Sequence, residues 1–229
     1  PNSTSTTGPG LVGGGYKEDY SCVPTLAEAL AASGYAARVL VEAGVVNFTS
    51  PDEALIHRAV AAAEAADVVV LALGAGLETV DEKEDLYDLG LPGAQEALAK
   101  AVAKVGKPTA AVLVMGNQYA IDAWVDDVDA VVDAFVPSGA AAADVVVATL
   151  FGANDRFGKL PYTLYARDYA HEVPLADASF RDRGYRYYAG KHVTFPFGSG
   201  LAYATFTLAD ARPAALAFDA ARGARRVSV

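Results

Sequence analysis

Cysteine and histidine are scarce in this sequence, and their scarcity limits the metal chemistry open to it. Cys22 is the only cysteine in 229 residues, which excludes an internal disulfide and every multi-cysteine zinc pattern. The three histidines, His57, His171 and His192, are far apart and show no spacing typical of metal ligands. We therefore expect no metal bound by cysteine or histidine, and no other cofactor.

Positive charge and long apolar runs are also lacking. The 18 Lys and Arg face 28 Asp and Glu, which gives a net charge of −10 and a pI near 4.7. Nucleic acids and anionic membranes are bound by clustered Lys and Arg, so this balance argues against both as partners. No apolar run reaches the roughly 18–20 residues that cross a bilayer, so we expect no membrane span. With 53% hydrophobic and 20% charged residues, the sequence is typical of a globular chain with a sizeable core.

The most informative stretch is an apolar run followed by an acidic loop. Residues 68–73 form an unbroken, valine-rich run that predicts a buried parallel strand, and it ends at Gly74 and Gly76, where the chain can turn sharply. Six carboxylates follow within eleven residues: Glu78, Asp81, Glu82, Glu84, Asp85 and Asp88. Because the carboxyl ends of the strands carry the chemistry of open α/β sheets, this loop is the first candidate for a functional site.

The first 150 residues alternate between helical and strand patterns. Thr25 and Glu28 form a predicted capping box for a helix that ends before Gly34, and Ser50 with Pro51 predicts the start of a second helix that runs to about residue 66. Further helices are predicted at 92–105, 120–124 and 140–150, and strands at 38–43, 67–73, 109–115 and 130–136. The alternation predicts an α/β fold with an open, mostly parallel sheet and helices on both faces, an α/β sandwich of the flavodoxin-like kind. Its strand-to-helix loops, including 74–91, should share one edge.

The character of the chain changes after residue 153. Tyrosine, phenylalanine and proline become dense, helical patterning disappears, and an irregular aromatic-rich segment is predicted. The tail at 207–229 alternates near its end, as if a β-rich module begins there. Trp124 follows Ile121 at helical spacing, which favours a place in the core.

Five short motifs occur in order along the chain. They are PN at 1–2, LGLPGAQ at 89–95, KLPYT at 159–163, GYRYY at 184–188 and FPFGSGLAYATF at 195–206. Together they resemble the second domain of the family-3 glycoside hydrolases, the retaining β-glucosidases and β-xylosidases. The resemblance implies that 1–206 form this α/β-sandwich domain without its first strand, and that 207–229 begin a fibronectin-III-like module. It also implies an N-terminal barrel domain, in cis or on another chain, that carries the nucleophilic aspartate.

The resemblance also indicates where a catalytic acid belongs. Retaining hydrolysis of a glycosidic bond uses two carboxyl groups, one as nucleophile and one as acid/base. In the xylosidase-like branch the loop resembles Glu-x-Glu-Gly-x-Asp-Arg-x-x-Leu-x-Leu-Pro-Gly, and the acid/base glutamate lies in or near it. Counted back from Pro92, Glu82 matches the second glutamate and Asp85 matches the aspartate. Val80 replaces the first glutamate, and Leu86 replaces the arginine.

A loop two residues shorter would instead place Glu82 and Glu84 on the pair of glutamates. Both alignments make Glu82 the first candidate for the acid/base, followed by Glu84 and Glu78, with Asp85 as a candidate for substrate binding. Two other interpretations stay open: the carboxylates are solvated and complement the dipole of the next helix, or Asp81 and Asp85 bind calcium.

Two classes of function are compatible with these residues. The first is part of a retaining β-glycosidase acting on non-reducing-end sugars, and the second is a non-catalytic family-3-like domain that serves as a structural or carbohydrate-binding element of an extracellular assembly. Nucleotide binding through Gly74 and Gly76 is disfavoured, because Thr79 stands where a dinucleotide fingerprint needs its third glycine.

The aromatic stretch 185–206 either lines a sugar-facing cleft or packs the edge of its own domain. Two glycosylation sequons begin at Asn2 and Asn47. With the implied carbohydrate substrate, they predict an extracellular or cell-wall location.

Overall fold

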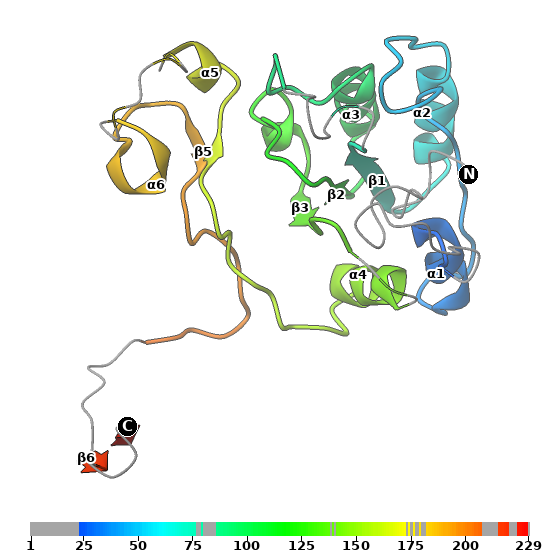
Figure 1. Ribbon diagram of the computed structural model, residues 1–229. Coiled ribbons are helices and arrows are strands. Elements are labelled where there is room, and N and C mark those ends of the chain that lie inside the picture. The colour runs from blue at the N-terminus through cyan, green and yellow to red at the C-terminus, as the bar shows by residue number, and fades with distance from the viewer. Residues whose placement is uncertain are drawn as a thin grey trace.

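A three-stranded parallel sheet lies at the centre of the computed structural model, which describes residues 23–76, 79, 86–137, 139, 141–172, 174, 176, 179, 182–207, 215–219 and 224–228. The strands are β1 (Val69–Gly74), β2 (Thr109–Val114) and β3 (Ala130–Asp133), in the order β1-β2-β3 (Figure 1). The pairing of β1 with β2 runs from Val69 and Thr109 to Gly74 and Val114, and that of β2 with β3 from Ala110 and Ala130 to Leu113 and Asp133, so all three strands are parallel. The predicted open parallel sheet is confirmed.

Helices cover both faces of this sheet because alternate side chains of each strand point to opposite sides. Leu71, Leu73 and Leu113 belong to a core shared with α2 (Ile56–Glu64) and α3 (Gln95–Ala103). Val112 and Val114 belong to a second core shared with α1 (Leu26–Ala32) and α4 (Ala142–Leu150). Figure 1 shows α2 and α3 on one side of the sheet and α1 and α4 on the other.

Helix α1 begins as the sequence predicts. The Thr25 side chain accepts a hydrogen bond from the backbone N–H of Glu28 at 3.1 Å, and the Glu28 carboxylate accepts one from the backbone N–H of Thr25 at 2.8 Å. This reciprocal pair satisfies two N–H groups that a helix start leaves unpaired. Gly34, just past the end, has a φ of 75°. The predicted capping box is confirmed.

The start predicted for the second helix is wrong. Ser50 and Asp52 do not cap a helix; their side chains accept hydrogen bonds from the backbone N–H two residues on, at 3.2 and 2.8 Å. Such local bonds compete with helix formation and favour turns. Helix α2 therefore begins at Ile56, after a turn.

Two more predicted elements are absent from the described part of the chain. Residues 38–43 are not a strand. They lie against α2, where Arg58 forms an ion pair with Glu42 at 2.9 Å, and Val41 stays 51% exposed. Residues 120–124 form turns that lead into a 3-10 helix, η1 (Val125–Asp127), in place of a longer helix. Both segments are too short for periodicity to separate them from turns.

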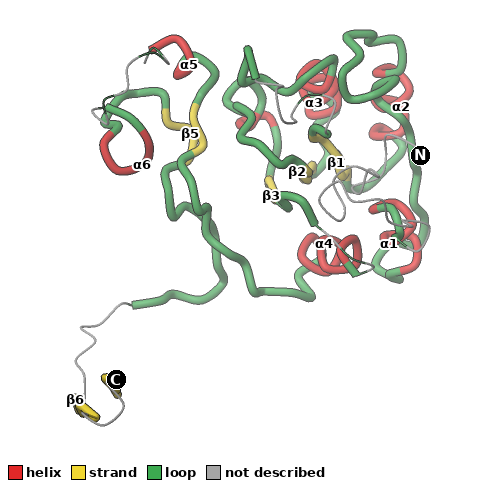
Figure 2. Tube along the Cα trace, in the orientation of Figure 1, coloured by secondary structure: helices red, strands yellow, loops and turns green. Residues whose placement is uncertain are grey.

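The segment after residue 153 is irregular, as predicted, but contains two one-turn helices. These are α5 (Tyr169–Glu172) and α6 (Gly184–Tyr187) (Figure 2). The strand before them, β4 (Leu164–Tyr165), pairs antiparallel with the strand after them, β5 (Val193–Phe195). Two further strands, β6 (Ala215–Asp219) and β7 (Ala224–Ser228), form an antiparallel pair in the tail. A fibronectin-III-like module in the tail stays a prediction. Among the described helices, none has the length and hydropathy needed to cross a bilayer.

Candidate functional site

The carboxyl ends of the three strands form a rim, and the acidic loop leaves from it. Gly74 is the last residue of β1, and a Cβ added there would lie 1.9 Å from the carbonyl oxygen of Val114 on β2. Only glycine therefore fits where the loop starts. The backbone N–H of Ala75 donates to the same carbonyl of Val114 at 3.1 Å. The first residues of the loop thus continue the sheet before turning away.

Gln95, at the start of α3, is hydrogen-bonded both to Gly74, where the loop begins, and to Pro92, just after the loop ends. Its side chain is 2% exposed. The amide oxygen accepts from the backbone N–H of Gly74 at 2.8 Å, and the amide nitrogen donates to the carbonyls of Gly74 at 2.8 Å and of Phe48 and Pro92 at 3.0 Å each. One buried side chain thereby contacts four backbone groups, with three carbonyls sharing the two N–H groups of its amide. The sequence signals Gln95 only as the last residue of the LGLPGAQ motif.

The exit of the loop is held by a second group of polar contacts, centred on Arg167. Its guanidinium binds both carboxylate oxygens of Asp88, with Nε donating to Oδ1 at 2.7 Å, and its Nη1 donates to Glu96 at 3.3 Å. The backbone N–H of Arg167 donates to Asp122 at 3.1 Å. We call Arg167, Asp88 and Glu96 the arginine clip. The hydrogen bond from Arg167 holds the pKa of the Asp88 carboxyl below its usual range.

The carboxylates of the clip also bind the backbone of the loop. Asp88 accepts from the N–H of Gly90 at 2.9 Å, and Glu96 accepts from the N–H of Leu91 at 3.2 Å. The N–H of Ala120 donates to the carbonyl of Leu89 at 2.6 Å. Residues 88–91 are therefore fixed from two sides.

A buried tyrosine holds the first part of the loop. The hydroxyls of Thr79 and Tyr119 lie 2.9 Å apart, and Thr79 also donates to the carbonyl of Gly76 at 3.0 Å. Tyr119 is 1% exposed, and burial raises the pKa of its hydroxyl. This hydroxyl therefore stays neutral and serves as a hydrogen-bonding anchor.

The residues predicted to do the chemistry lie between these anchors. Glu78, Glu82, Glu84 and Asp85 lie outside the described residues, as does Asn2. Leu86, where the family pattern has an arginine, packs against the core that contains α2 and α3. The assignment of Glu82 as acid/base stays a prediction. Within the described ranges, no group of three or more His, Cys, Asp or Glu is arranged to hold a metal ion.

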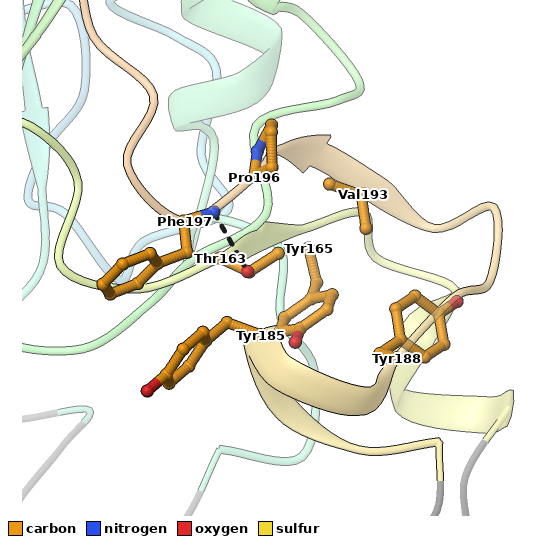
Figure 3. Close-up of a pocket in the computed structure, with 7 residues that line it drawn as sticks. All are labelled: Thr163, Tyr165, Tyr185, Tyr188, Val193, Pro196 and Phe197. Carbon is orange, nitrogen blue, oxygen red and sulfur yellow. Dashed lines mark hydrogen bonds between the residues drawn. The ribbon is translucent and has the colours of Figure 1, made fainter. Parts of the chain in front are cut away.

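An aromatic pocket of about 190 Å³ lies in the segment after residue 153 (Figure 3). Tyr165 stacks on Tyr169 with ring centroids 3.9 Å apart, and Tyr188 meets both rings edge-on. Tyr185 stacks on Phe197 at 4.4 Å. Each of these rings already packs against another ring, which favours packing of the domain's own edge over a sugar-facing cleft.

Asn47, the described sequon asparagine, has an exposed side chain at a turn. Its Oδ1 accepts from the N–H groups of Thr49 at 3.1 Å and of Ser50 at 2.8 Å. Trp124 is 1% exposed within the core, as its spacing predicts.

Arg167 carries no signal in the sequence. Its partners Asp88 and Glu96 are 79 and 71 residues away, and they meet it only because the chain returns to the rim after β4. Isolated charged residues at such separations form no recognisable pattern.

Comparison with known proteins identifies the fold and the family. The glycosyl hydrolase family 3 C-terminal domain matches residues 3–203. The chain is 36% identical to β-D-xylosidase 1 of Arabidopsis thaliana over 180 residues, which cover 75% of this chain and 23% of the relative. It is 35% identical to the exo-1,4-β-xylosidase bxlB of Emericella nidulans over 212 residues, 89% of this chain and 27% of the relative.

Solved structures give the same result. A GH3 exo-β-xylosidase (XlnD) in complex with a xylobiose aziridine probe superposes with a TM-score of 0.72 at 26% identity, over 80% of this chain and 24% of that one. A β-glucosidase from Listeria innocua in complex with isofagomine gives 0.70 at 26% identity, over 94% and 31%. The sequence thus spans about a quarter of the length of the two xylosidase relatives, 23% and 27%. The chain belongs to the glycosyl hydrolase family 3 C-terminal domain family.

Proposed function

We propose that this chain is part of a retaining β-glycosidase of the β-xylosidase or β-glucosidase type, and that its acidic loop supplies the general acid/base. Glu82 is the residue proposed for that role, with Glu84 and Glu78 as the next candidates and Asp85 as a contact to the substrate. The nucleophile belongs to an N-terminal barrel domain, in cis or on another chain. The names of the relatives and of the superposed structures support this class of carbohydrate substrate.

The observation that carries the proposal is the anchoring of the loop at both ends. Gln95 fixes its start to its end through the backbone of Gly74 and Pro92, and the arginine clip fixes its exit at Asp88. A catalytic carboxyl must be held close to its productive geometry, and two rigid ends provide this for a loop. The rim of an open α/β sheet is also where such folds bind their ligands.

The local charge suits an acid that must carry a proton near neutral pH. The loop concentrates six carboxylates within eleven residues, and neighbouring negative charge raises the pKa of a carboxyl. In a retaining mechanism the protonated acid donates to the leaving-group oxygen, while a carboxylate about 5–5.5 Å away attacks the anomeric carbon. The same residue then removes a proton from the water that releases the sugar.

The test is turnover of the full-length protein with Glu82→Gln. Loss of a general acid/base reduces turnover by ~10²–10⁴-fold, and the loss should be largest for β-xylosides with poor leaving groups. Glu84→Gln and Glu78→Gln are the matched controls, since each removes one carboxylate from the same loop. Unchanged turnover in Glu82→Gln, with a loss in one of the controls, would move the role to that residue.

A non-catalytic role, as a structural or carbohydrate-binding element of an extracellular assembly, is the second candidate, and Leu86 is the observation that favours it over catalysis. Its side chain packs on the core, so it cannot replace the bidentate contacts that an arginine would offer a sugar. If this candidate is right, the full-length protein does not hydrolyse aryl β-xylosides or β-glucosides, and calorimetry with xylo-oligosaccharides separates a carbohydrate-binding role from a structural one. Measurable hydrolysis that depends on Glu82 rejects it.

We also propose an extracellular or cell-wall location for the full-length protein. The exposed side chain of Asn47, which begins a sequon, supports it. Mass spectrometry of the natively produced protein should find a glycan on Asn47 that Asn47→Gln removes. An unmodified Asn47 in that material would contradict this part of the proposal.

A further inference from the structure

The loop lacks the arginine of the family pattern, and a different arginine lies at its exit. Leu86 occupies the pattern's position and packs into the core. Arg167 reaches the exit from the segment that follows β4 and binds Asp88 and Glu96 there. We propose that Arg167 is the positioning residue of the acidic loop, orienting its acid/base from outside the loop. The inference rests on the proposed function, because it concerns the same carboxylates.

The geometry of the clip is that of an orienting contact. Arg167 binds Asp88 through two nitrogens and two oxygens, the bidentate arrangement that fixes direction as well as distance. Asp88 and Glu96 then accept from the N–H groups of Gly90 and Leu91, so the guanidinium acts on the loop's backbone through both carboxylates. Displacement of Arg167 would remove its hydrogen bonds to Asp88 and Glu96. These two carboxylates would then no longer be held in place to bind the loop backbone.

Gly90 is part of the same arrangement. A Cβ added to Gly90 would lie 2.7 Å from the Arg167 Cζ and 2.8 Å from the Glu96 Oε1. The guanidinium therefore occupies the space that a Cβ at position 90 would need, so any residue other than glycine would push it away. The obstructing atoms are the ends of flexible side chains, so Gly90→Ala should displace Arg167 without breaking the fold.

The clip is too exposed to serve mainly as a source of stability. The side chains of Arg167, Asp88 and Glu96 are 44%, 55% and 19% exposed. Ion pairs exposed to this degree contribute little to folding, whereas a bidentate network still restricts orientation. Loss of Arg167 should therefore affect catalysis much more than folding.

The experiment compares leaving groups in the full-length enzyme. Phenyl β-xyloside needs a proton from the acid when its bond breaks, and 2,4-dinitrophenyl β-xyloside does not. A misplaced acid should lower kcat/KM, which reports the step in which the glycosidic bond breaks, by ~10–100-fold for the phenyl substrate and leave kcat/KM for the dinitrophenyl substrate within about 3-fold of wild type. We expect this signature for Arg167→Gln, a smaller one for Gly90→Ala, and partial recovery with Arg167→Lys, which keeps the charge but loses the fork.

Arg58→Gln is the matched control. It also removes an exposed arginine paired with a carboxylate, at 2.9 Å from Glu42, and this ion pair shares no residue with the arginine clip. Both substrates should stay at wild-type rates in this variant.

The outcomes separate the two claims. Equal losses for both substrates in Arg167→Gln, or no loss, would overturn the positioning role, because partial unfolding lowers all rates together. If neither Glu82→Gln nor the two other glutamate variants show the leaving-group signature, the proposed function fails instead. Should Arg167→Gln not fold, Gly90→Ala decides, since it displaces the guanidinium while the arginine is retained.

Discussion

The α/β sandwich and the aromatic segment that follows it are held together by different interactions. Around the sheet, side chains such as Leu113 and Val147 are 1–2% exposed and pack in two cores. After residue 153, Tyr185 and Tyr187 are each 54% exposed, and order depends on stacked rings and polar bonds. Burial of apolar surface stabilises a fold strongly and does not depend on direction. Exposed polar contacts stabilise it weakly and require a particular geometry. The acidic loop is joined to both regions, through Gln95 on one side and Arg167 on the other.

The largest expected effect is a break in the core of the sandwich. Trp124→Ala should lower the free energy of unfolding by about 3–5 kcal/mol, because it leaves a large cavity beneath the rim. Among the described residues, the Trp124 Nε1 has no hydrogen-bond partner. Trp124→Phe should therefore cost much less, since little polar bonding is lost. Urea denaturation of both variants checks this, and equal costs would contradict it.

This first prediction depends on a residue whose place could be inferred from the sequence. The strands at 69–74 and 109–114 and the capping box of Thr25 follow from local periodicity or local bonding. The burial of Trp124 is predicted correctly, although the helix assumed around it does not form. The start of α2 could not be inferred, because the Ser50 hydroxyl can accept a hydrogen bond from a nearby backbone N–H either as a helix cap or in a turn. The clip at Arg167 could not be inferred either, because its charge partners are distant in the chain.

The next largest loss of stability is expected when the hydrogen bonds between Gln95 and the end of β1 are removed. Gln95→Leu should lower the free energy of unfolding by about 2–3 kcal/mol, since it leaves the buried N–H of Gly74 and several carbonyls without a partner. The control is Gln118→Leu at an exposed position, which should stay within about 0.5 kcal/mol of wild type. A small cost for Gln95→Leu would show that water replaces the amide.

A smaller effect is expected where the aromatic segment joins the sheet. The Tyr162 hydroxyl donates to Asp133 at the end of β3, and burial, together with this bond, raises the pKa of Tyr162. Tyr162→Phe removes a half-buried bond to a charged group and should lower the free energy of unfolding by about 1–2 kcal/mol. Tyr187→Phe, an exposed tyrosine of α6, is the control and should be neutral. Equal effects of the two variants would remove the distinction between the regions.

The smallest effect is a pH dependence of the clip. Arg167 holds the pKa of Asp88 below its unfolded value of about 3.9, so the stabilisation is present above that pH and is lost as pH falls through the folded pKa. The difference in the free energy of unfolding between wild type and Asp88→Asn should therefore shrink below about pH 4. Both carboxylate and guanidinium are exposed, so the difference should stay below about 1 kcal/mol. A pH-independent difference would argue against the ion pair.

The most direct test of the central claim is azide rescue of Glu82→Gln in the full-length protein. If Glu82 is the acid/base on a loop held at the rim, turnover of 2,4-dinitrophenyl β-xyloside should rise with azide concentration, and NMR should identify β-xylosyl azide as the product. Azide reaches the sugar without the proton removal that water needs. A Glu82→Gln variant that turns over at the wild-type rate, does not respond to azide and yields xylose as its sole product would contradict the account.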